Sequence, residues 1–148
     1  MAIHNESRRA ATSTDARRLA LLAAGDVGIF LMFAALGRRS HGEAAGIAAV
    51  GQVLETAAPF IIGWLAIAPL VGAFRPGMLE HPRALLGRSL LAWLLALPVG
   101  LLLRMLIRQS AFPPISFAIT TFLIVGVLLG AWRGGFAWWQ QRGARNGD

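Results

Sequence analysis

The stretch LALLAAGDVGIFLMFAAL, residues 19–36, decides the fold, because it is an apolar run interrupted by a single acid, Asp26. A helix needs about 20 apolar residues to cross the roughly 30 Å hydrocarbon core of a membrane. Three further apolar runs follow, at about residues 53–74, 84–107 and 114–132. Each is predicted to be helical, because backbone polar groups inside lipid must be paired within the chain. The short connections favour antiparallel hairpins, so the predicted fold is an all-α, polytopic membrane bundle of four transmembrane helices.

The composition also favours a membrane protein over a soluble one. Of the 148 residues, 56% are hydrophobic and only 14% are charged, whereas soluble domains contain about 25% charged residues. The formal net charge is +7, and every one of the 14 basic residues is arginine. These arginines punctuate the apolar runs instead of forming one basic stripe. The expected partner is therefore the lipid bilayer and not nucleic acid.

The chain lacks the residues that several kinds of catalytic and metal site require. The chain contains no cysteine, which excludes disulfides, thiolate metal ligands and cysteine nucleophiles. Its three histidines, His4, His41 and His81, are too widely spaced to suggest a zinc site. No glycine-rich nucleotide loop and no serine–histidine–acid set is evident. We therefore expect no cofactor, no metal and no catalytic residue, and predict that the protein is not an enzyme.

Arginine positions predict the orientation in the membrane. Residues 1–16 are predicted to be a flexible polar tail, 17–139 the transmembrane domain, and 140–148 a second polar tail. With the N-terminus in the cytoplasm, the outer side carries four arginines and the inner side ten, the asymmetry expected of cytoplasmic loops. Both termini are therefore predicted to be cytoplasmic, in a multi-pass protein of the inner membrane. The outer four are Arg38, Arg39, Arg104 and Arg108, and the inner ten are Arg8, Arg9, Arg17, Arg18, Arg75, Arg83, Arg88, Arg133, Arg142 and Arg145.

Asp26 is the first candidate site residue. At about 1.5 Å per residue it lies roughly 12 Å inside the hydrocarbon core. A charge there is costly towards lipid, so we expect the side chain to face the bundle interior. It is either a coupling site for a proton or cation, or a structural acid paired with an arginine such as Arg88. Gly25 and Gly28 beside it would let another helix approach closely.

Glu55 is the second candidate. Pro59 lacks an N–H, so the carbonyl of Glu55 loses its helical partner and could bind a cation together with the carboxylate. Alternatively, Glu55 lies near the outer interface beside an ordinary proline kink. Arg104 falls at a similar depth on the third span. A structural ion pair between Glu55 and Arg104 is as well supported as a transport site, and we expect the two side chains to be close.

The segment GRRSHGE, residues 37–43, is the densest polar cluster between two spans. Arg38, Arg39, His41 and Glu43 form a candidate outer-loop site for an anion, a lipid headgroup or a protein partner. The alternative is a solvated turn whose arginines anchor the chain at the membrane interface.

Three glycines at intervals of four residues, Gly126, Gly130 and Gly134, mark one face of the last span. Small residues at this spacing are typical of helix packing in membranes. They predict a packing face and leave a homodimer or another membrane partner open.

The segments GDVGIFLMFAALGRRSHGE and LETAAPFIIGW together resemble a bacterial family of small four-span membrane proteins, catalogued as domain of unknown function 3054. The resemblance covers roughly residues 19–132. It implies a four-helix membrane fold and points to the same polar residues, but it implies no activity. The matching positions are Gly25, Asp26, Gly37, Arg38, His41, Glu55, Pro59, Phe60, Gly63 and Trp64.

Three functions are weighed on this basis. The first is a small-solute or ion transporter that uses a membrane-embedded carboxylate. The second is a non-catalytic subunit or scaffold whose buried polar residues hold helices together. The third and least favoured is an enzyme that acts on lipid-linked substrates through the outer loop. Pairing of both Asp26 and Glu55 with arginines would favour the scaffold, whereas a carboxylate facing an open polar cavity would favour transport.

Overall fold

The computed structural model describes the backbone of residues 2–40 and 47–145, and the side chains of residues 14–38 and 49–143. This part of the chain is helical and contains no strand. Its elements, in chain order, are α1 (Ala2–Ser40), α2 (Ile47–Leu70), the short 3-10 helix η1 (Met78–Glu80), α3 (Pro82–Arg108) and α4 (Ile115–Arg145).

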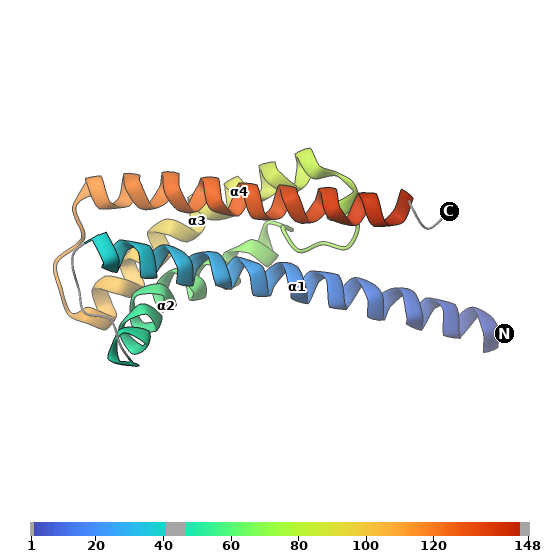
Figure 1. The fold of residues 1–148 in the computed structure, drawn as a ribbon, viewed down its shortest axis with the longest axis horizontal. Helices are drawn as coiled ribbons and strands as arrows, with labels where there is room; N and C mark the ends of the chain where they lie inside the picture. The colour runs from blue at the N-terminus through green and yellow to red at the C-terminus, as the bar shows by residue number, and fades with distance from the viewer. Residues whose placement is uncertain (1, 41–46, 146–148) are drawn as a thin grey trace.

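The long helices lie side by side along the long axis of the molecule (Figure 1). The start of α1 and the end of α4 lie towards one end, here called the terminal end, together with η1 (Figure 1). The end of α1, the start of α2 and the α3–α4 connection lie towards the opposite end, here called the loop end (Figure 1). Each helix packs on its neighbours in sequence, most extensively α2 on α3, and α1 also packs on α4. In the described chain the helices therefore form a closed ring.

Two helices extend beyond their predicted spans. The backbone of α1 is helical from Ala2, so residues that were predicted to form a flexible tail continue the first helix. Residues 2–18 contain neither glycine nor proline, so nothing stops the helix there. The last helix continues past the predicted end at residue 132 to Arg145. An apolar run marks the part of a helix that lies in lipid, not the point where its hydrogen bonding ends.

The second helix ends in a glycine turn. Gly72 has a φ of 74°, a left-handed conformation that glycine adopts without steric cost. Its N–H donates to the Pro69 carbonyl at 3.0 Å, and the Ala73 N–H donates to the Ala68 carbonyl at 2.9 Å. This pair of hydrogen bonds is a Schellman motif, which satisfies carbonyls at the end of a helix. The turn begins the connection from α2 to α3 at the terminal end.

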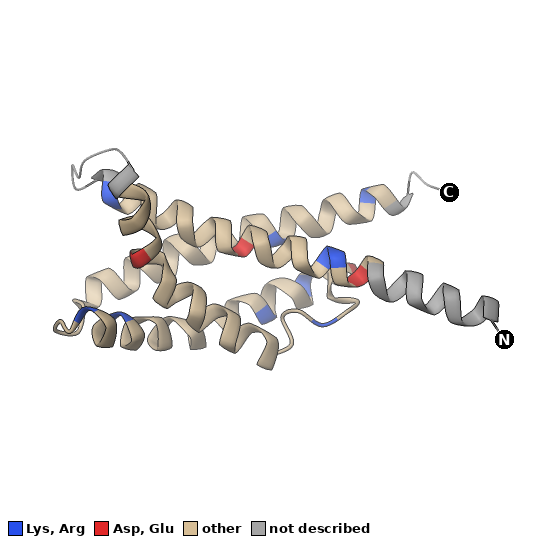
Figure 2. Ribbon diagram, turned by 90° about the horizontal axis from the view of Figure 1, so that it is seen from below, with Lys and Arg blue, Asp and Glu red and all other residues tan. Residues whose placement is uncertain are grey.

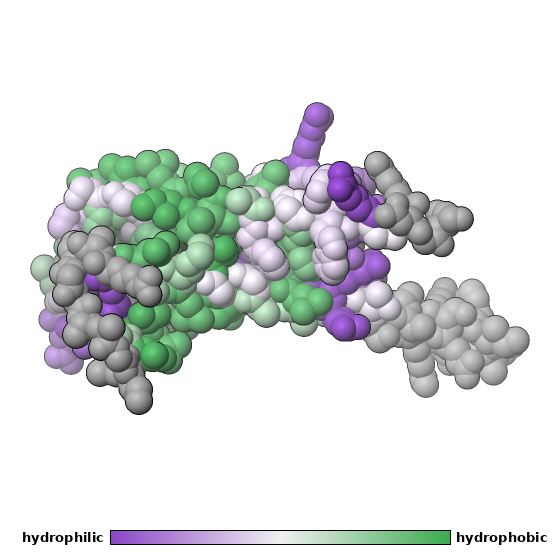
Figure 3. All heavy atoms as spheres, in the orientation of Figure 1, coloured by the Kyte–Doolittle hydropathy of each residue, from purple (hydrophilic) through white to green (hydrophobic). Residues whose placement is uncertain are grey.

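The outer surface identifies a multi-pass membrane protein. All four long helices have segments long and apolar enough to cross a bilayer. Large apolar side chains cover their outward faces, including Leu123, Val127 and Leu90, which are 57%, 70% and 55% exposed. Figure 3 shows a hydrophobic belt between more hydrophilic ends, and Figure 2 shows that charged residues are sparse along the middle of the bundle.

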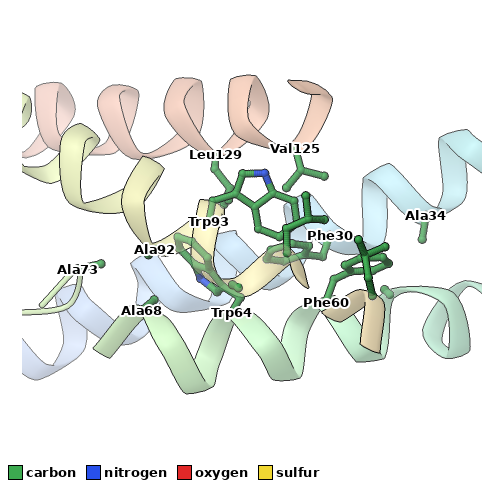
Figure 4. Packing of buried hydrophobic residues seen from close by; sticks show 14 of the residues in the cluster. Phe30, Ala34, Phe60, Trp64, Ala68, Ala73, Ala92, Trp93, Val125 and Leu129 are labelled. Carbon is green, nitrogen blue, oxygen red and sulfur yellow. The ribbon is translucent and has the colours of Figure 1, made fainter. Parts of the chain in front are cut away.

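Aromatic side chains fill the centre of the ring (Figure 4). Phe30 of α1, Phe60 and Trp64 of α2, and Trp93 of α3 are all at most 2% exposed. The Phe30 and Trp93 rings are tilted, with centroids 5.4 Å apart, and the Phe60 and Trp93 rings meet edge to face at 6.5 Å. The Trp93 indole N–H donates to the Phe122 carbonyl at 3.0 Å. The contact between Phe30 and Trp93 therefore joins α1 and α3, whose backbones do not approach each other closely.

The closest helix approach is between α2 and α3. A Cβ atom on Gly63 would lie 2.9 Å from the Ala96 carbonyl oxygen, which belongs to the α3 backbone. A Cβ atom on Gly100 would lie 2.7 Å from the Phe60 ring. Only glycine fits at these two positions without a shift of one helix against the other.

The predicted packing face on α4 is not a close helix contact. A Cβ atom on Gly130 would meet nothing within 4 Å. Cβ atoms on Gly126 and Gly134 would make ordinary contacts, at 3.5 Å with Trp93 and 3.8 Å with Leu86. Gly126 and Gly134 therefore face side chains of α3 and not its backbone.

Candidate functional site

The most distinctive polar site is a buried ion pair between α1 and α4. The guanidinium of Arg133 binds the carboxylate of Asp26 through two parallel hydrogen bonds, Nε to Oδ1 at 3.0 Å and Nη2 to Oδ2 at 2.5 Å. Both side chains are 0% exposed. A two-point arginine–carboxylate contact is among the stronger hydrogen-bonded arrangements in proteins, because it fixes orientation as well as charge. The interior position expected for Asp26 is confirmed.

The same guanidinium also binds the turn that follows α2 and a side chain of α3. Its Nη1 donates to the Ala73 carbonyl, in the turn after α2, and to the Ser89 hydroxyl of α3, each at 3.1 Å. The Ser89 hydroxyl in turn donates to the Leu85 carbonyl at 2.6 Å. One side chain of α4 thus joins α1, the end of α2 and α3. We call Asp26, Arg133, Ser89 and the Ala73 carbonyl the Arg133 network.

Two aromatic rings complete the surroundings of Arg133. Its guanidinium carbon lies 4.9 Å from the ring centroid of Trp64 and 4.6 Å from that of Phe74. Such cation–π contacts are strongest where water is excluded. The Trp64 indole N–H also donates to Asp26 Oδ2 at 3.1 Å. The Asp26 carboxylate therefore accepts from Arg133 and from Trp64, and each of its two oxygens has a donor.

Close packing between α1 and α4 places the pair. A Cβ atom on Gly25 would fall about 2 Å from the Trp132 ring, so only glycine leaves room for that indole. The Trp132 indole N–H donates to the Leu22 carbonyl of α1 at 3.2 Å. Gly25 therefore allows the close approach that was predicted next to Asp26. Gly28 does not take part, since nothing lies within 4 Å of the position of its Cβ.

The predicted partner of Asp26 was wrong. Arg88 donates to the Val71 carbonyl at 3.4 Å and lies against Gly72, at the end of α2. Arg133 was counted among the arginines of the inner side because the apolar run ends at Trp132. Since α4 continues to Arg145, Arg133 lies within the helix and reaches the interior. No signal in the sequence marked this continuation, because Gly134 and Gly135 follow Arg133 directly.

A second ion pair lies towards the loop end. Glu55 Oε1 of α2 is 3.6 Å from Arg108 Nη2 of α3, and these side chains are 54% and 35% exposed. The pair therefore involves Arg108 and not the predicted Arg104, which lies one turn earlier on the same helix. The guanidinium of Arg104 instead lies 5.3 Å from the ring centroid of Phe117 on α4.

The outer-loop candidates are only partly described. Arg38 donates to the side-chain oxygen of Gln52, which links the end of α1 to the start of α2. The side chain of Arg39, and the whole of His41 and Glu43, lie outside the described residues. Among the described side chains, no group of three or more histidine, aspartate or glutamate residues is arranged to hold a metal ion.

A lateral groove of about 170 Å³ lies between α3 and α4. Its walls include Leu86, Leu90, Gly126 and Gly130, and Ser89 lies at its base. Ser89 also accepts a hydrogen bond from Arg133, so only the Ser89 side chain separates the groove from the buried ion pair. The missing side chains of the glycines on α4 create the space.

A family model described as "Protein of unknown function (DUF3054)" matches residues 23–136. The matched region contains the central part of α1, all of α2 and α3, and α4 as far as Phe136, and so includes the whole Arg133 network. The chain belongs to this family. No match was found among curated proteins or among solved structures.

Proposed function

We propose that this member of the family is a non-catalytic membrane scaffold or subunit, whose Arg133 network holds four helices in one arrangement. The observation that carries the proposal is pairing. Asp26 is bound to Arg133, and Glu55 is in ion contact with Arg108. A scaffold of this kind would act through its lipid-facing helices, on another membrane protein or on a second copy of itself.

The enclosure of Asp26 argues against a coupling site. A carboxylate that carries a proton or a cation must be reached by water or solute at some stage of the cycle. Asp26 is 0% exposed, and its oxygens accept from Arg133 and Trp64. A matched network of this kind is better suited to selecting one helix arrangement, because every arrangement that separates the two charges leaves both unpaired in a medium of low dielectric.

We further propose that the protein lies in the inner membrane with the terminal end in the cytoplasm. The support is the arginine asymmetry. With Arg133 assigned to the interior, nine of the ten arginines counted for that side remain, against four at the loop end. Cytoplasmic loops carry such an excess of positive charge.

The test combines ion flux with stability for wild type and Asp26→Asn. Proteoliposomes would be assayed for proton, potassium and chloride flux, and the same proteins for thermal unfolding in detergent. We expect wild-type flux no greater than that of empty liposomes, and a lower melting temperature for Asp26→Asn. Asp15→Asn, an exposed acid on the same helix, is the matched control and should melt like wild type. Wild-type flux that Asp26→Asn abolishes without loss of stability would contradict the proposal.

Small-solute transport is a second candidate, and the groove between α3 and α4 is the observation that favours it. A solute entering there would meet Ser89, whose hydroxyl is bonded to Arg133. Leu90→Trp would fill the groove from a position that is 55% exposed. If the protein transports a solute by this route, Leu90→Trp should reduce flux while Leu94→Trp, one turn along the same exposed face, should not.

A further inference from the structure

Two arginines lie near the end of α3, and among the described side chains only one of them is in ion contact with an acid. Arg104 and Arg108 are four residues apart, so they lie on the same face of the helix. Glu55 contacts Arg108 at 3.6 Å, which is too long for a hydrogen bond. Like charges at this spacing repel each other. Arg104, Arg108 and Glu55 therefore carry a net charge of +1 among the described side chains.

The side chain of Arg104 is held in place without an acceptor. Its Nη1 is buried and has no hydrogen-bond partner among the described residues. The guanidinium rests over the Phe117 ring at 5.3 Å, and the residue as a whole is half-buried. An aromatic face attracts a cation but accepts no conventional hydrogen bond from it. The chain thus orients this guanidinium and leaves its Nη1 without an acceptor among the described residues.

The position within the membrane identifies the missing acceptor. Arg108 is the last residue of α3 and ends the segment that can span a bilayer. Arg104 is one turn, about 6 Å, deeper. Long arginine side chains at this depth extend towards the headgroup layer, where phosphate is the abundant anion. The planar guanidinium fork matches phosphate oxygens as it matches a carboxylate.

We propose that Arg104 and Arg108 form a phosphate-binding site at the loop end, and that its ligand is a phospholipid headgroup. The phosphate accepts hydrogen bonds from the two guanidiniums and relieves their mutual repulsion, while Glu55 keeps Arg108 directed towards α2. This site is separate from the Arg133 network and does not depend on whether the protein is a scaffold or a transporter.

The test is native mass spectrometry of the purified protein in detergent, titrated with phosphatidylglycerol, phosphatidylcholine or inorganic phosphate. We expect one preferentially bound phospholipid per chain. In the double variant Arg104→Gln/Arg108→Gln its dissociation constant should rise about tenfold, which corresponds to about 1.4 kcal/mol. The control is Arg75→Gln/Arg83→Gln, which removes the same charge from two exposed positions at the terminal end and should keep the affinity.

Melting temperature gives a second reading that does not require the double variant to be stable. Phosphatidylglycerol should raise the melting temperature of wild type, because a ligand that binds the folded state stabilises it. Arg104→Lys/Arg108→Lys keeps the charge but loses the planar fork, and should show a smaller rise. Equal stabilisation by inorganic phosphate would support the phosphate site but overturn its assignment to a lipid. Equal loss of affinity in both glutamine variants, or no stabilisation of wild type by any phosphate compound, would overturn the site itself.

Discussion

Arg133 is bound on several sides. It makes two hydrogen bonds to Asp26, one to Ser89 and one to a backbone carbonyl, and it lies between two rings. A charged residue at the centre of a transmembrane helix costs about 2.5 to 3.5 kcal/mol even on the mildest scale. Individual hydrogen bonds between membrane helices contribute about 0.6 kcal/mol on average. These four bonds therefore do not fully offset the cost of even one buried charge, and the larger effect is the penalty for separating the pair.

A double-mutant cycle tests this penalty. We expect Asp26→Leu or Arg133→Met alone to lower the free energy of unfolding by about 3 to 5 kcal/mol, because each leaves a buried charge unpaired. The double variant should lose much less than the sum, since it removes both charges. Reversible unfolding in detergent mixtures, followed by tryptophan fluorescence, measures all four proteins. Asp15→Leu is the exposed control. Additive losses would mean that Asp26 and Arg133 contribute independently.

The burial of Asp26 could be predicted from the sequence, whereas its partner could not. The acid was recognisable, because Asp26 interrupts an otherwise apolar run, and its burial followed from the cost of facing lipid. Its partner was not recognisable, because that choice depends on how far α4 continues and how it is rotated against α1. Hydropathy encodes neither quantity. For the same reason the ion pair at the loop end joins Glu55 to Arg108 and not to Arg104, although depth alone could not distinguish these two arginines.

At the scale of the helices, the α2–α3 contact depends on two glycines. We expect Gly63→Ala to destabilise the protein by about 1 to 3 kcal/mol, the range of overpacked cores, because the new methyl group would press on the α3 backbone. Gly130→Ala should be neutral or slightly stabilising, because nothing lies near that position and alanine is the better helix former. Thermal unfolding in one detergent compares the two. Equal destabilisation by both changes would show that helix flexibility, and not close approach, is what matters.

The spacing of glycines along α4 does not by itself predict a close contact between helix backbones. Gly126, Gly130 and Gly134 follow the spacing of a packing motif, yet α3 meets this strip with Trp93 and Leu86 and leaves a groove. Gly63 and Gly100 lie on different helices, so no spacing within one segment marks them as partners. Spacing shows which residues share a helix face. It does not show whether the facing helix presents backbone or bulky side chains.

In the molecule as a whole, the Arg133 network joins the four helices of the closed ring. The backbones of the described helices approach closely only between neighbours in the ring. Across its centre, the Arg133 network joins α4 to α1, to the end of α2 and to α3 through one side chain. The four apolar runs could be predicted because length and hydropathy determine which segments cross a bilayer. The order of contacts around the ring could not, because several rings satisfy the same four spans.

The orientation of this ring in the membrane can be tested by labelling single introduced cysteines, because the chain contains none of its own. Ser110 lies in the α3–α4 connection at the loop end, and Gly143 lies near the end of α4; both are exposed. If the arginine-rich terminal end is cytoplasmic, Ser110→Cys should react with a membrane-impermeant maleimide in intact cells. Gly143→Cys should react only after the membrane is permeabilised. The cysteine-free wild type reports background labelling.

The reverse pattern would place the terminal end outside and would show that arginine distribution does not set orientation in this protein. Labelling of both positions from the same side would contradict the ring itself, because α4 could not then cross the membrane between residues 115 and 143. The experiment therefore separates two claims that rest on different physics. That α4 crosses the membrane is predicted from the length of its apolar segment. The direction in which it crosses is predicted from the excess of arginines at the terminal end, nine against four at the loop end.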